Sequence, residues 1–219
     1  MSGKLILFTI LGLVFVVLGS TFAEAQDLQP IQLVKPQTEG GKPLMQALNE
    51  RSSAREYSDV KLPPQVLSNL LWAASGINRQ ESGKRTAPTA SNRQEMDIYV
   101  ALPEALYVYE AKTHSLQPVL AKDIRATTGR QEYVGQAALN LVYVADYAKM
   151  GGNEEAGKIL NSGAATGCIA QNVYLFCASE GLSTVIRGNI DKLVLAKEMN
   201  LREDQKITLA QTVGYPKKQ

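Results

Sequence analysis

The stretch from Glu154 to Glu180 constrains the fold more than any other part of the chain. It reads as the longest helix of the sequence, it is apolar nearly all round from Ala164 to Ala178, and Gly181 follows as a stop signal. A helix that is apolar around most of its circumference buries most of its surface. We therefore expect a central helix, at the core of the domain or at a subunit interface, around which the other elements are arranged.

Shorter segments on both sides of this helix carry the patterns of strands and helices. We expect strands at 97–102, 105–110, 116–119, 139–145, 183–187 and 206–214. We also expect helices that begin near Pro43 and Pro64, a helix at 191–199, one or two helical turns within 120–137 and a polar loop at 77–87. Strands and helices intermix without a regular βαβ repeat, which favours the α+β class, with a mixed, mainly antiparallel sheet flanked by helices.

Several side chains give specific expectations within this arrangement. Leu44 and Leu48 are one turn apart and should form the inner face of the first helix. Cys168 and Cys177 are separated by about 13.5 Å of helix, which is too far for a disulfide, so both should be small buried side chains. His114 lies in a polar turn and should be an ordinary surface residue.

The start of the chain has the pattern of a secretory signal peptide. Lys4 is followed by an apolar run at 5–18 and then by Ala23-Glu24-Ala25, after which we place the cleavage. The alternative is an uncleaved membrane anchor, but the run is shorter than the roughly 20 apolar residues of a spanning helix. We therefore expect export to the periplasm or the outside, without stable membrane insertion after cleavage. The predicted organisation is a signal peptide at 1–25, an extended leader at 26–42 and one domain at 43–219.

The composition argues against several classes of function. The chain has 23 basic and 21 acidic residues, a net charge of +2, and its basic residues do not gather in blocks. This disfavours general binding of nucleic acid or membrane surfaces. One histidine and two cysteines give neither a metal-ligand cluster nor a hydrolase constellation, and the sequence has no dinucleotide fingerprint and no phosphate-loop motif. We predict no metal site and no nucleic-acid partner.

The segment from Arg51 to Arg55 is a candidate phosphate site. It brings two guanidinium groups together with the hydroxyls of Ser52 and Ser53. Guanidinium forks match phosphate oxygens, and hydroxyls and backbone amides complete such a cradle. The alternative is that a serine caps a helix and the arginines lie in solvent. Further along, the small residues of 87–92 would let a flat ligand approach the backbone.

Four stretches, in this order, resemble the nitroreductase family, whose members bind FMN. Residues 50–57 are similar to the family's Arg-x-Ser-x-Arg/Lys-x-Phe/Tyr, and residues 88–94 to its Pro-Ser-x-x-Asn-x-Gln. Residues 167–182 resemble the family's central helix with its Gly-Leu exit, and Gly214-Tyr215-Pro216 resembles the family's C-terminal segment. The meander at 105–116 further resembles the SagB-like subgroup, which contains peptide azoline dehydrogenases.

The resemblance implies an FMN-dependent oxidoreductase that forms a homodimer with flavin sites at the subunit interface. The chemistry would belong to the flavin, with ping-pong hydride transfer through N5 to or from a small organic substrate, and no catalytic side chain is implied. The implied phosphate and ribityl contacts are Arg51, Ser52, Ser53 and Arg55, with Lys217 or Lys218 as a further cation. The implied ring contacts are Ala90, Ser91 and Asn92, from the same or the other subunit, and Ile186, Arg187 and Gly188, where a backbone N–H reaches N5.

Two departures from the family pattern qualify this prediction. Residues 146–152 lack the adjacent Lys-Tyr pair that the azoline dehydrogenases use, so peptide azoline oxidation is disfavoured. The signal peptide would also place the chain where NAD(P)H is not expected. Two alternatives therefore stay open: a non-catalytic flavin-binding module in the cell envelope, and a structural protein that keeps the fold without the flavin.

Overall fold

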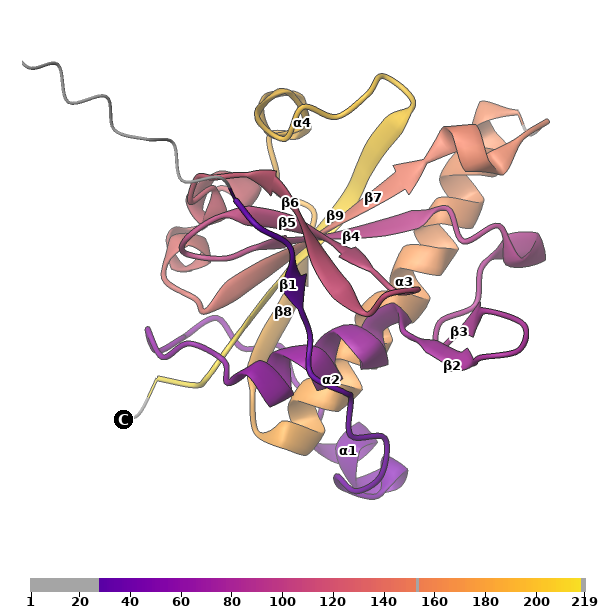
Figure 1. Ribbon diagram of the computed structural model, residues 1–219. Helices are drawn as coiled ribbons and strands as arrows, with labels where there is room; N and C mark the ends of the chain where they lie inside the picture. Colours follow the sequence, from indigo (N-terminus) through magenta and orange to yellow (C-terminus); the bar gives the residue numbers. More distant parts are fainter. Residues whose placement is uncertain (1–27, 153, 218–219) are drawn as a thin grey trace, which may run out of the picture.

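The computed structural model describes residues 28–152 and 154–217. The predicted signal peptide and Lys218 lie outside the described residues. Within them, the α+β class is confirmed: helices flank one large antiparallel sheet, with a long helix packed against it (Figure 1).

The main sheet has seven strands in the order β1-β6-β5-β4-β7-β9-β8, and every neighbouring pair is antiparallel. All six predicted strands are present in it. The strands are β1 (Ile31–Gln32), β4 (Met96–Ala101), β5 (Leu106–Glu110), β6 (Ser115–Leu120), β7 (Leu139–Asp146), β8 (Ser183–Arg187) and β9 (Gln205–Gly214). The edge strand β1 comes from the leader, and β8 forms the other edge.

Helices cover both faces of this sheet. The helices are α1 (Leu44–Glu50), α2 (Pro64–Ser75), α3 (Glu155–Glu180) and α4 (Lys192–Glu198). Helices α2 and α3 pack on one face, with α1 against α3, and α4 lies on the other face (Figure 1). Short 3-10 turns are η1 (Ala90–Asn92), η2 (Arg125–Thr128), η3 (Glu132–Gly135) and η4 (Tyr147–Met150).

The segment 77–87, predicted as a loop, contains a small hairpin instead. Strands β2 (Ile77–Arg79) and β3 (Lys84–Arg85) pair antiparallel in a separate two-stranded sheet. The polar composition gave no apolar alternation, but the side chain of Arg79 donates to the carbonyl of Arg85 at 2.7 Å and closes the hairpin. The prediction of a loop throughout 77–87 was therefore wrong.

The leader runs along α2 and then crosses the C-terminal end of α3. The N–H of Gln37 donates to Asn69 Oδ1 on α2 at 2.8 Å, and the N–H of Lys42 donates to Ser179 Oγ on α3 at 2.8 Å. Between these anchors lie Gly40 and Gly41, which both have positive φ. The leader is thus fastened to the domain on both sides of these glycines.

His114 joins the leader to the sheet. The prediction that it is an ordinary surface residue was wrong. It does lie in a turn, but it is half-buried, with Nε2 2.7 Å from Ser68 Oγ and Nδ1 2.9 Å from Tyr109 Oη. The hydroxyl of Ser68 donates its only proton to the carbonyl of Val34 at 2.5 Å. The Nε2–H of His114 must then donate to Ser68, and Tyr109 must donate to Nδ1. Burial lowers the pKa of His114.

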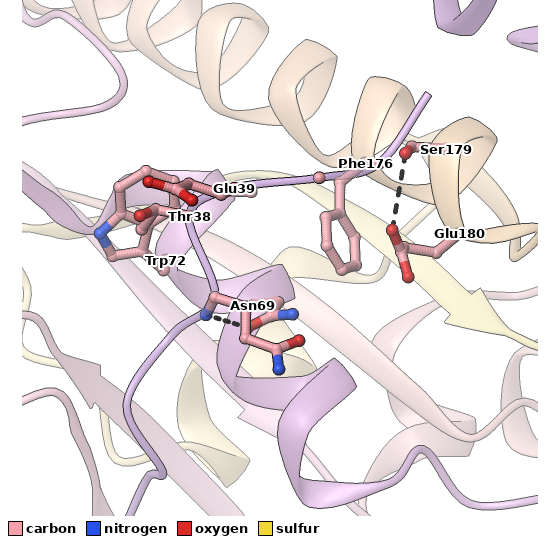
Figure 2. Close-up of a pocket in the computed structure, with 11 residues that line it drawn as sticks. Thr38, Glu39, Asn69, Trp72, Phe176, Ser179 and Glu180 are labelled. Atoms are coloured by element: carbon pink, nitrogen blue, oxygen red, sulfur yellow. Dashed lines mark hydrogen bonds between the residues drawn. The ribbon is translucent and has the colours of Figure 1, made fainter. Parts of the chain in front are cut away.

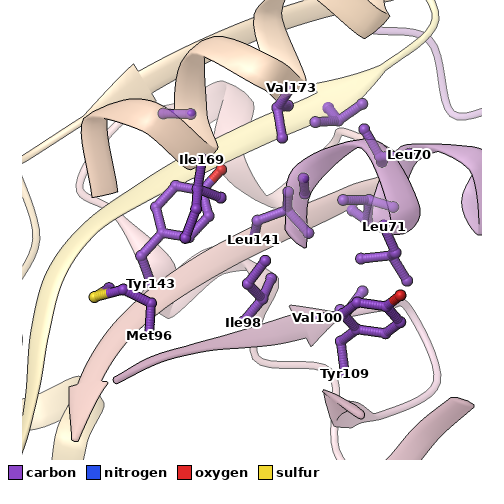
Figure 3. Packing of buried hydrophobic residues seen from close by; sticks show 14 of the residues in the cluster. Leu70, Leu71, Met96, Ile98, Val100, Tyr109, Leu141, Tyr143, Ile169 and Val173 are labelled. Atoms are coloured by element: carbon purple, nitrogen blue, oxygen red, sulfur yellow. The ribbon is translucent and has the colours of Figure 1, made fainter. Parts of the chain in front are cut away.

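The core explains why β7 is central. Every residue of β7 is buried, because helices cover both faces of the sheet there. Leu141 and Tyr143 face the cluster built with α2 and α3, which Figure 3 shows, while Val142 and Val144 face α4. Tyr143 donates to Gln211 Oε1 at 2.6 Å, so its buried hydroxyl is satisfied.

Helix α3 is the central helix, but it is not buried all round. Ile169, Val173 and Cys177 face the sheet, and the opposite side is exposed in the single chain. The exposed side is a stripe with a spacing of three and four residues: Leu160, Gly163, Ala164, Gly167 and Cys168. The prediction for Cys177 is confirmed, whereas the prediction that Cys168 is buried was wrong. Because small residues lie on several sides of this helix, its sequence did not show which side faces the sheet.

The inner face of α1 was also predicted wrongly. Leu44 and Leu48 are 63% and 43% exposed, and Ala47 is the buried residue. The small side chain of Ala47 lets α1 lie close to α3, which turns both leucines outward. Together with Met45, they leave an apolar patch on the surface of the single chain.

Candidate functional site

Tyr174 on α3 organises the segment that was predicted to hold a phosphate. Its hydroxyl lies 2.8 Å from Ser53 Oγ and accepts the N–H of Ile186 at 3.0 Å. The guanidinium of Arg51 stacks over its ring, 5.3 Å from the centroid. One side chain therefore brings the end of α1 and the outer edge of β8 to the same place.

Backbone contacts fix the rest of this segment. The N–H of Ala54 donates to the carbonyl of Thr184 at 3.0 Å, and the hydroxyl of Tyr57 donates back to the carbonyl of Ala54 at 2.7 Å. Tyr57 forms a bridge with Pro216, one residue before Lys217. The chain that contains Arg51 and Arg55 thus runs between the start of β8 and the C-terminal segment.

The cations of this segment are free to meet an anion. Arg55 and Lys217 are exposed and Arg51 is half-buried. Within 28–152 and 154–217, none of the three forms an ion pair, whereas nearby Glu50 is paired with Lys42. Ser52 and Ser53 follow the end of α1 and cap no helix start, which contradicts the capping part of the alternative interpretation, whereas the exposed Arg55 agrees with its other part. We call Arg51, Ser52, Ser53, Arg55 and Lys217 the cradle.

The guanidinium of Arg187 is committed to the protein interior. Its side chain is 6% exposed and donates to Thr212 Oγ1 at 3.1 Å, to Asn140 Oδ1 at 2.6 Å, and to the carbonyl and hydroxyl of Thr128. A Cβ at Gly129 would lie 2.4 Å from its Nη1, so a glycine is required there. Burial lowers the pKa of Arg187 to about 10. Only the backbone of Arg187 remains for a ligand.

Edge strand β8 offers a candidate donor in Gly188. Thr184 and Ile186 point their backbone groups away from the sheet, to Ala54 and Tyr174. Because alternate residues of an edge strand share this direction, the next outward amide in the register is that of Gly188. The amide of Ile186 is already used by Tyr174, so Gly188 is the better candidate for the flavin contact implied at 186–188.

The small-residue loop before β4 is strained. Ser91, Asn92 and Gln94 have φ of +54°, +53° and +50°, which side chains other than glycine rarely adopt. Two hydrogen bonds of Gln94 hold the loop. Its Oε1 accepts from Arg85 Nε at 2.9 Å, and its Nε2 donates to the carbonyl of Gly83 at 3.0 Å. Strain that the surroundings maintain is typical of ligand-binding segments.

The strained loop and the cradle do not meet within one chain. Met96, just after the loop, contacts Thr166 on α3, with Sδ 3.9 Å from Oγ1. Tyr174 lies eight residues further along the same helix, a rise of about 12 Å. Figure 1 likewise shows the start of β4 well away from α1. The loop with Ala90, Ser91 and Asn92 thus lies about two helical turns from Tyr174, which holds Arg51 and Ser53.

Two residues near these segments were missed in the sequence. Tyr174 was hidden in a helix read as apolar, although a buried tyrosine hydroxyl usually needs a partner. Glu95 follows the strained loop, is 0% exposed, and finds no hydrogen-bond partner for either carboxylate oxygen among the described residues. An acidic residue at the entry of an apolar strand was the available signal for Glu95.

Residues within 52–61 line several cavities. A small one of about 60 Å³ is lined by Ser52, Ala54, Tyr174 and Thr184, among others. A cavity of about 490 Å³ lies beside Tyr57 and is lined by Lys61 and Arg125. None of the helices within the described ranges has the length and apolarity of a membrane span. The described side chains also contain no group of three or more acidic, histidine or cysteine residues that could hold a metal ion.

Comparisons with known proteins agree with this geometry. The family model described as "Nitroreductase family" matches residues 48–215. A relative from Methanocaldococcus jannaschii, assigned as a nitroreductase, is 31% identical over 172 residues, which cover 74% of this chain and 85% of the relative.

Solved structures share the fold. A protein from Ralstonia eutropha JMP134, assigned as a nitroreductase, has a TM-score of 0.84 and 43% identity, over 87% of this chain and 90% of that one. One from Desulfovibrio desulfuricans, also assigned as a nitroreductase and solved in complex with FMN, has a TM-score of 0.59 and 21% identity, over 82% and 89% of the two chains. The second likeness concerns the fold alone. With the family model and the archaeal relative, these findings show that the chain belongs to the nitroreductase family.

Proposed function

We propose that this chain is an exported, homodimeric FMN-dependent oxidoreductase that transfers hydride to or from a small organic substrate. Family membership gives the reaction class, and FMN is bound by one member of the same fold. The observation that carries the proposal is the convergence of Arg51, Ser53 and the outer edge of β8 on Tyr174.

The cradle fits the phosphate of FMN. A phosphate monoester carries a charge between about −1.5 and −2 at neutral pH, and guanidinium groups bind its oxygens in a bidentate way. Arg51, Arg55 and Lys217 bring three cations that no described carboxylate neutralises, and Ser52 and Ser53 add hydroxyls. Stacking on Tyr174 restricts the Arg51 guanidinium before a ligand arrives, which reduces the entropy lost on binding.

A second copy of the chain would complete the site. Within one chain, the loop that carries Ala90, Ser91 and Asn92 enters β4 beside Thr166, about two turns of α3 away from Tyr174. The exposed stripe of α3 and the apolar patch of α1 offer a surface for association, because exposed apolar patches of this kind mark interaction sites. A two-fold dimer would place the loop of one protomer against the cradle of the other.

Bound FMN would supply hydride transfer through its N5 atom, and this chain's residues would position it. The outward amide of Gly188 would donate to the ring, and the loop at 90–92 would cover one side of it. No side chain at the site is needed as a proton donor. The meander β5–β6 supports placement near the SagB-like subgroup, while residues 146–152, which lack a Lys-Tyr pair, disfavour peptide azoline oxidation.

Export is supported by the signal-peptide pattern at 1–25 alone. An exported enzyme would meet little NAD(P)H, so we propose that its reductant is another small molecule or that its substrate is itself oxidised. Fractionation of cells that produce the full chain, with N-terminal sequencing of the mature protein, tests this. A mature chain that keeps Met1 and stays in the cytoplasm would contradict export without affecting the flavin proposal.

The flavin proposal is tested by binding. We expect the purified chain to show visible flavin bands after FMN is added. Arg51→Ala and Arg55→Ala should each weaken FMN about tenfold to a hundredfold, because hydrogen bonds to charged groups contribute about 1.5–3 kcal/mol. Riboflavin, which lacks the phosphate, should be affected far less. Arg202→Ala serves as the matched control, since Arg202 pairs with Asp146 away from the cradle.

The same preparation separates an enzyme from a binding module. The bound flavin is photoreduced without oxygen and mixed with candidate acceptors. Reoxidation that is faster with an acceptor than with buffer supports the oxidoreductase, and equal rates with every acceptor would favour the non-catalytic module. Equal loss of FMN and riboflavin in the arginine variants would show that the cradle does not hold the phosphate.

A further inference from the structure

A separate cavity of about 320 Å³ lies where the leader crosses the C-terminal end of α3. Its walls come from the leader, from α2 and from α3. Figure 2 shows the rings of Trp72 and Phe176 on two sides of it, with Asn69 between them. The other principal lining side chains are Glu39, Ser179 and Glu180.

This cavity is distinct from the cradle. The small cavity beside the cradle is lined by Tyr174, Cys177 and Ala178 of α3. Phe176, Ser179 and Glu180 line the cavity of Figure 2. At 3.6 residues per turn these two sets lie on opposite sides of the helix, so its full width separates the two cavities.

The walls of the cavity are fixed by contacts of their own. The indole N–H of Trp72 donates to the carbonyl of Ile77 at 3.1 Å, and its ring packs on Gly76, where a Cβ would lie 2.4 Å from Cδ1. The leader is anchored at Asn69 and at Ser179, and a Cβ at Gly41 would lie 2.7 Å from Ser179 Oγ. The cavity is therefore formed before a ligand arrives.

The charge around the cavity is negative. Glu39 and Glu180 line it, and no lysine or arginine does. In the part of the chain that the structure describes, neither carboxylate forms an ion pair, and Glu180 accepts only the hydroxyl of Ser179, at 3.5 Å. The nearby Lys42 is neutralised by Glu50 at 2.5 Å. The C-terminal end of α3 adds the negative end of the helix dipole.

We propose that this cavity binds a small organic cation, an alkylammonium or quaternary ammonium group, between Trp72 and Phe176. Aromatic faces attract such cations through the ring quadrupole, and carboxylates at the rim add a Coulomb attraction. A cavity of this volume is at the small end of ligand sites. The proposal is independent of the flavin, because the cavity uses none of the cradle residues.

Tryptophan fluorescence tests this directly, since Trp72 is the only tryptophan of the chain. The full chain is titrated with choline and, in parallel, with 3,3-dimethyl-1-butanol, which has the same shape without the charge. We expect a saturable change with choline and none with the neutral alcohol. The titration is run with and without added FMN, so that its outcome does not depend on the flavin site.

Variants locate the response. Glu39→Gln and Glu180→Gln keep the shape of the cavity and remove one charge each, and each should weaken choline about twofold to fivefold, as expected for exposed charge pairs. Glu81→Gln, an exposed acid in the turn of the β2–β3 hairpin, should have no effect. A response that is absent, equal for the neutral alcohol, or unchanged in the double variant Glu39→Gln/Glu180→Gln would overturn the proposal.

Discussion

The cradle and the strained loop before β4 contrast within one protein. Around the cradle, polar groups find partners inside the chain: Tyr174, Ile186 and Arg187 are all hydrogen-bonded. Around the loop, backbone strain at Ser91, Asn92 and Gln94 is followed by a buried carboxylate that lacks a described partner. The framework of the first region is held within a single chain, while the cations of the cradle form no ion pair among the described residues and Ser58 Oγ, beside Tyr57, has no described hydrogen-bond partner. The second has the features of a region that is completed by a ligand or by another copy.

The largest expected effect belongs to the framework around the cradle, where Arg187 is buried. Arg187→Met should lower the free energy of unfolding by about 3 kcal/mol or more, because it leaves Asn140, Thr212 and the carbonyl of Thr128 buried without their donor. Urea denaturation measures this change. Arg187→Lys keeps the charge without the planar fork and should be intermediate. A loss below about 1 kcal/mol would show that this network contributes little to the fold.

Next to the strained loop, we expect a substitution to raise the free energy of unfolding. Glu95→Gln should raise the free energy of unfolding of the flavin-free chain by about 1–3 kcal/mol, since burying a carboxyl group without a described partner costs more than burying a neutral amide. The control is Asp97→Asn, because Asp97 lies two residues away and is paired with Lys149 at 2.7 Å. That control should lower stability slightly. Lower stability in Glu95→Gln would mean that the carboxylate has a partner, and repeating the measurement with FMN would identify whether the ligand provides it.

A smaller effect should follow from the hub of the cradle. Tyr174→Phe keeps the ring under Arg51 but leaves the amide of Ile186 and Ser53 Oγ without their shared partner. We expect a loss of about 1–2 kcal/mol in stability and a weaker affinity for FMN, measured by denaturation and by flavin fluorescence. Tyr99→Phe is the matched control, because the hydroxyl of Tyr99 lies on the other face of the sheet and accepts one long hydrogen bond, from Gln205 Nε2 at 3.4 Å. Equal effects in both variants would remove Tyr174 from the site.

The sequence predicted what depends on local pattern. The six strands and the bounds of the long helix followed from periodicity and from Gly181, which closes α3 with φ of +69°. The position of the cradle stays a prediction, which was made from residue types that match a phosphate.

The features that the sequence did not predict depend on contacts between residues far apart in the chain. The partners of Arg187 lie 25 to 59 residues away in the chain, so its burial could not be read locally. Because α3 is rich in glycine and alanine, its sequence did not show which side packs on the sheet. Leu44 and Leu48 were predicted to be core residues because the spacing of apolar residues in a helix does not show whether they pack against the same chain or against another one.

The smallest expected effect concerns pH and the leader. The chain has one histidine, so a titration near neutral pH reports mainly on His114. Burial holds the pKa of His114 below its ordinary value of about 6.5. The folded chain therefore binds this proton less tightly than the unfolded chain does. Stability should be at its full value above about pH 6.5 and should fall as the pH drops below it.

The hydrogen-bond directions give the reason for this sign. In the neutral ring Nδ1 accepts from Tyr109, while a proton on Nδ1 would face a hydroxyl that keeps its own proton, because burial raises the pKa of Tyr109. Denaturation midpoints measured from pH 8 to pH 5 should fall more steeply for the native chain than for His114→Gln. The link from Ser68 to Val34 should weaken at the same time, so proteolysis of the leader should quicken in that range. Parallel curves for the two proteins would show that His114 does not couple the leader to pH.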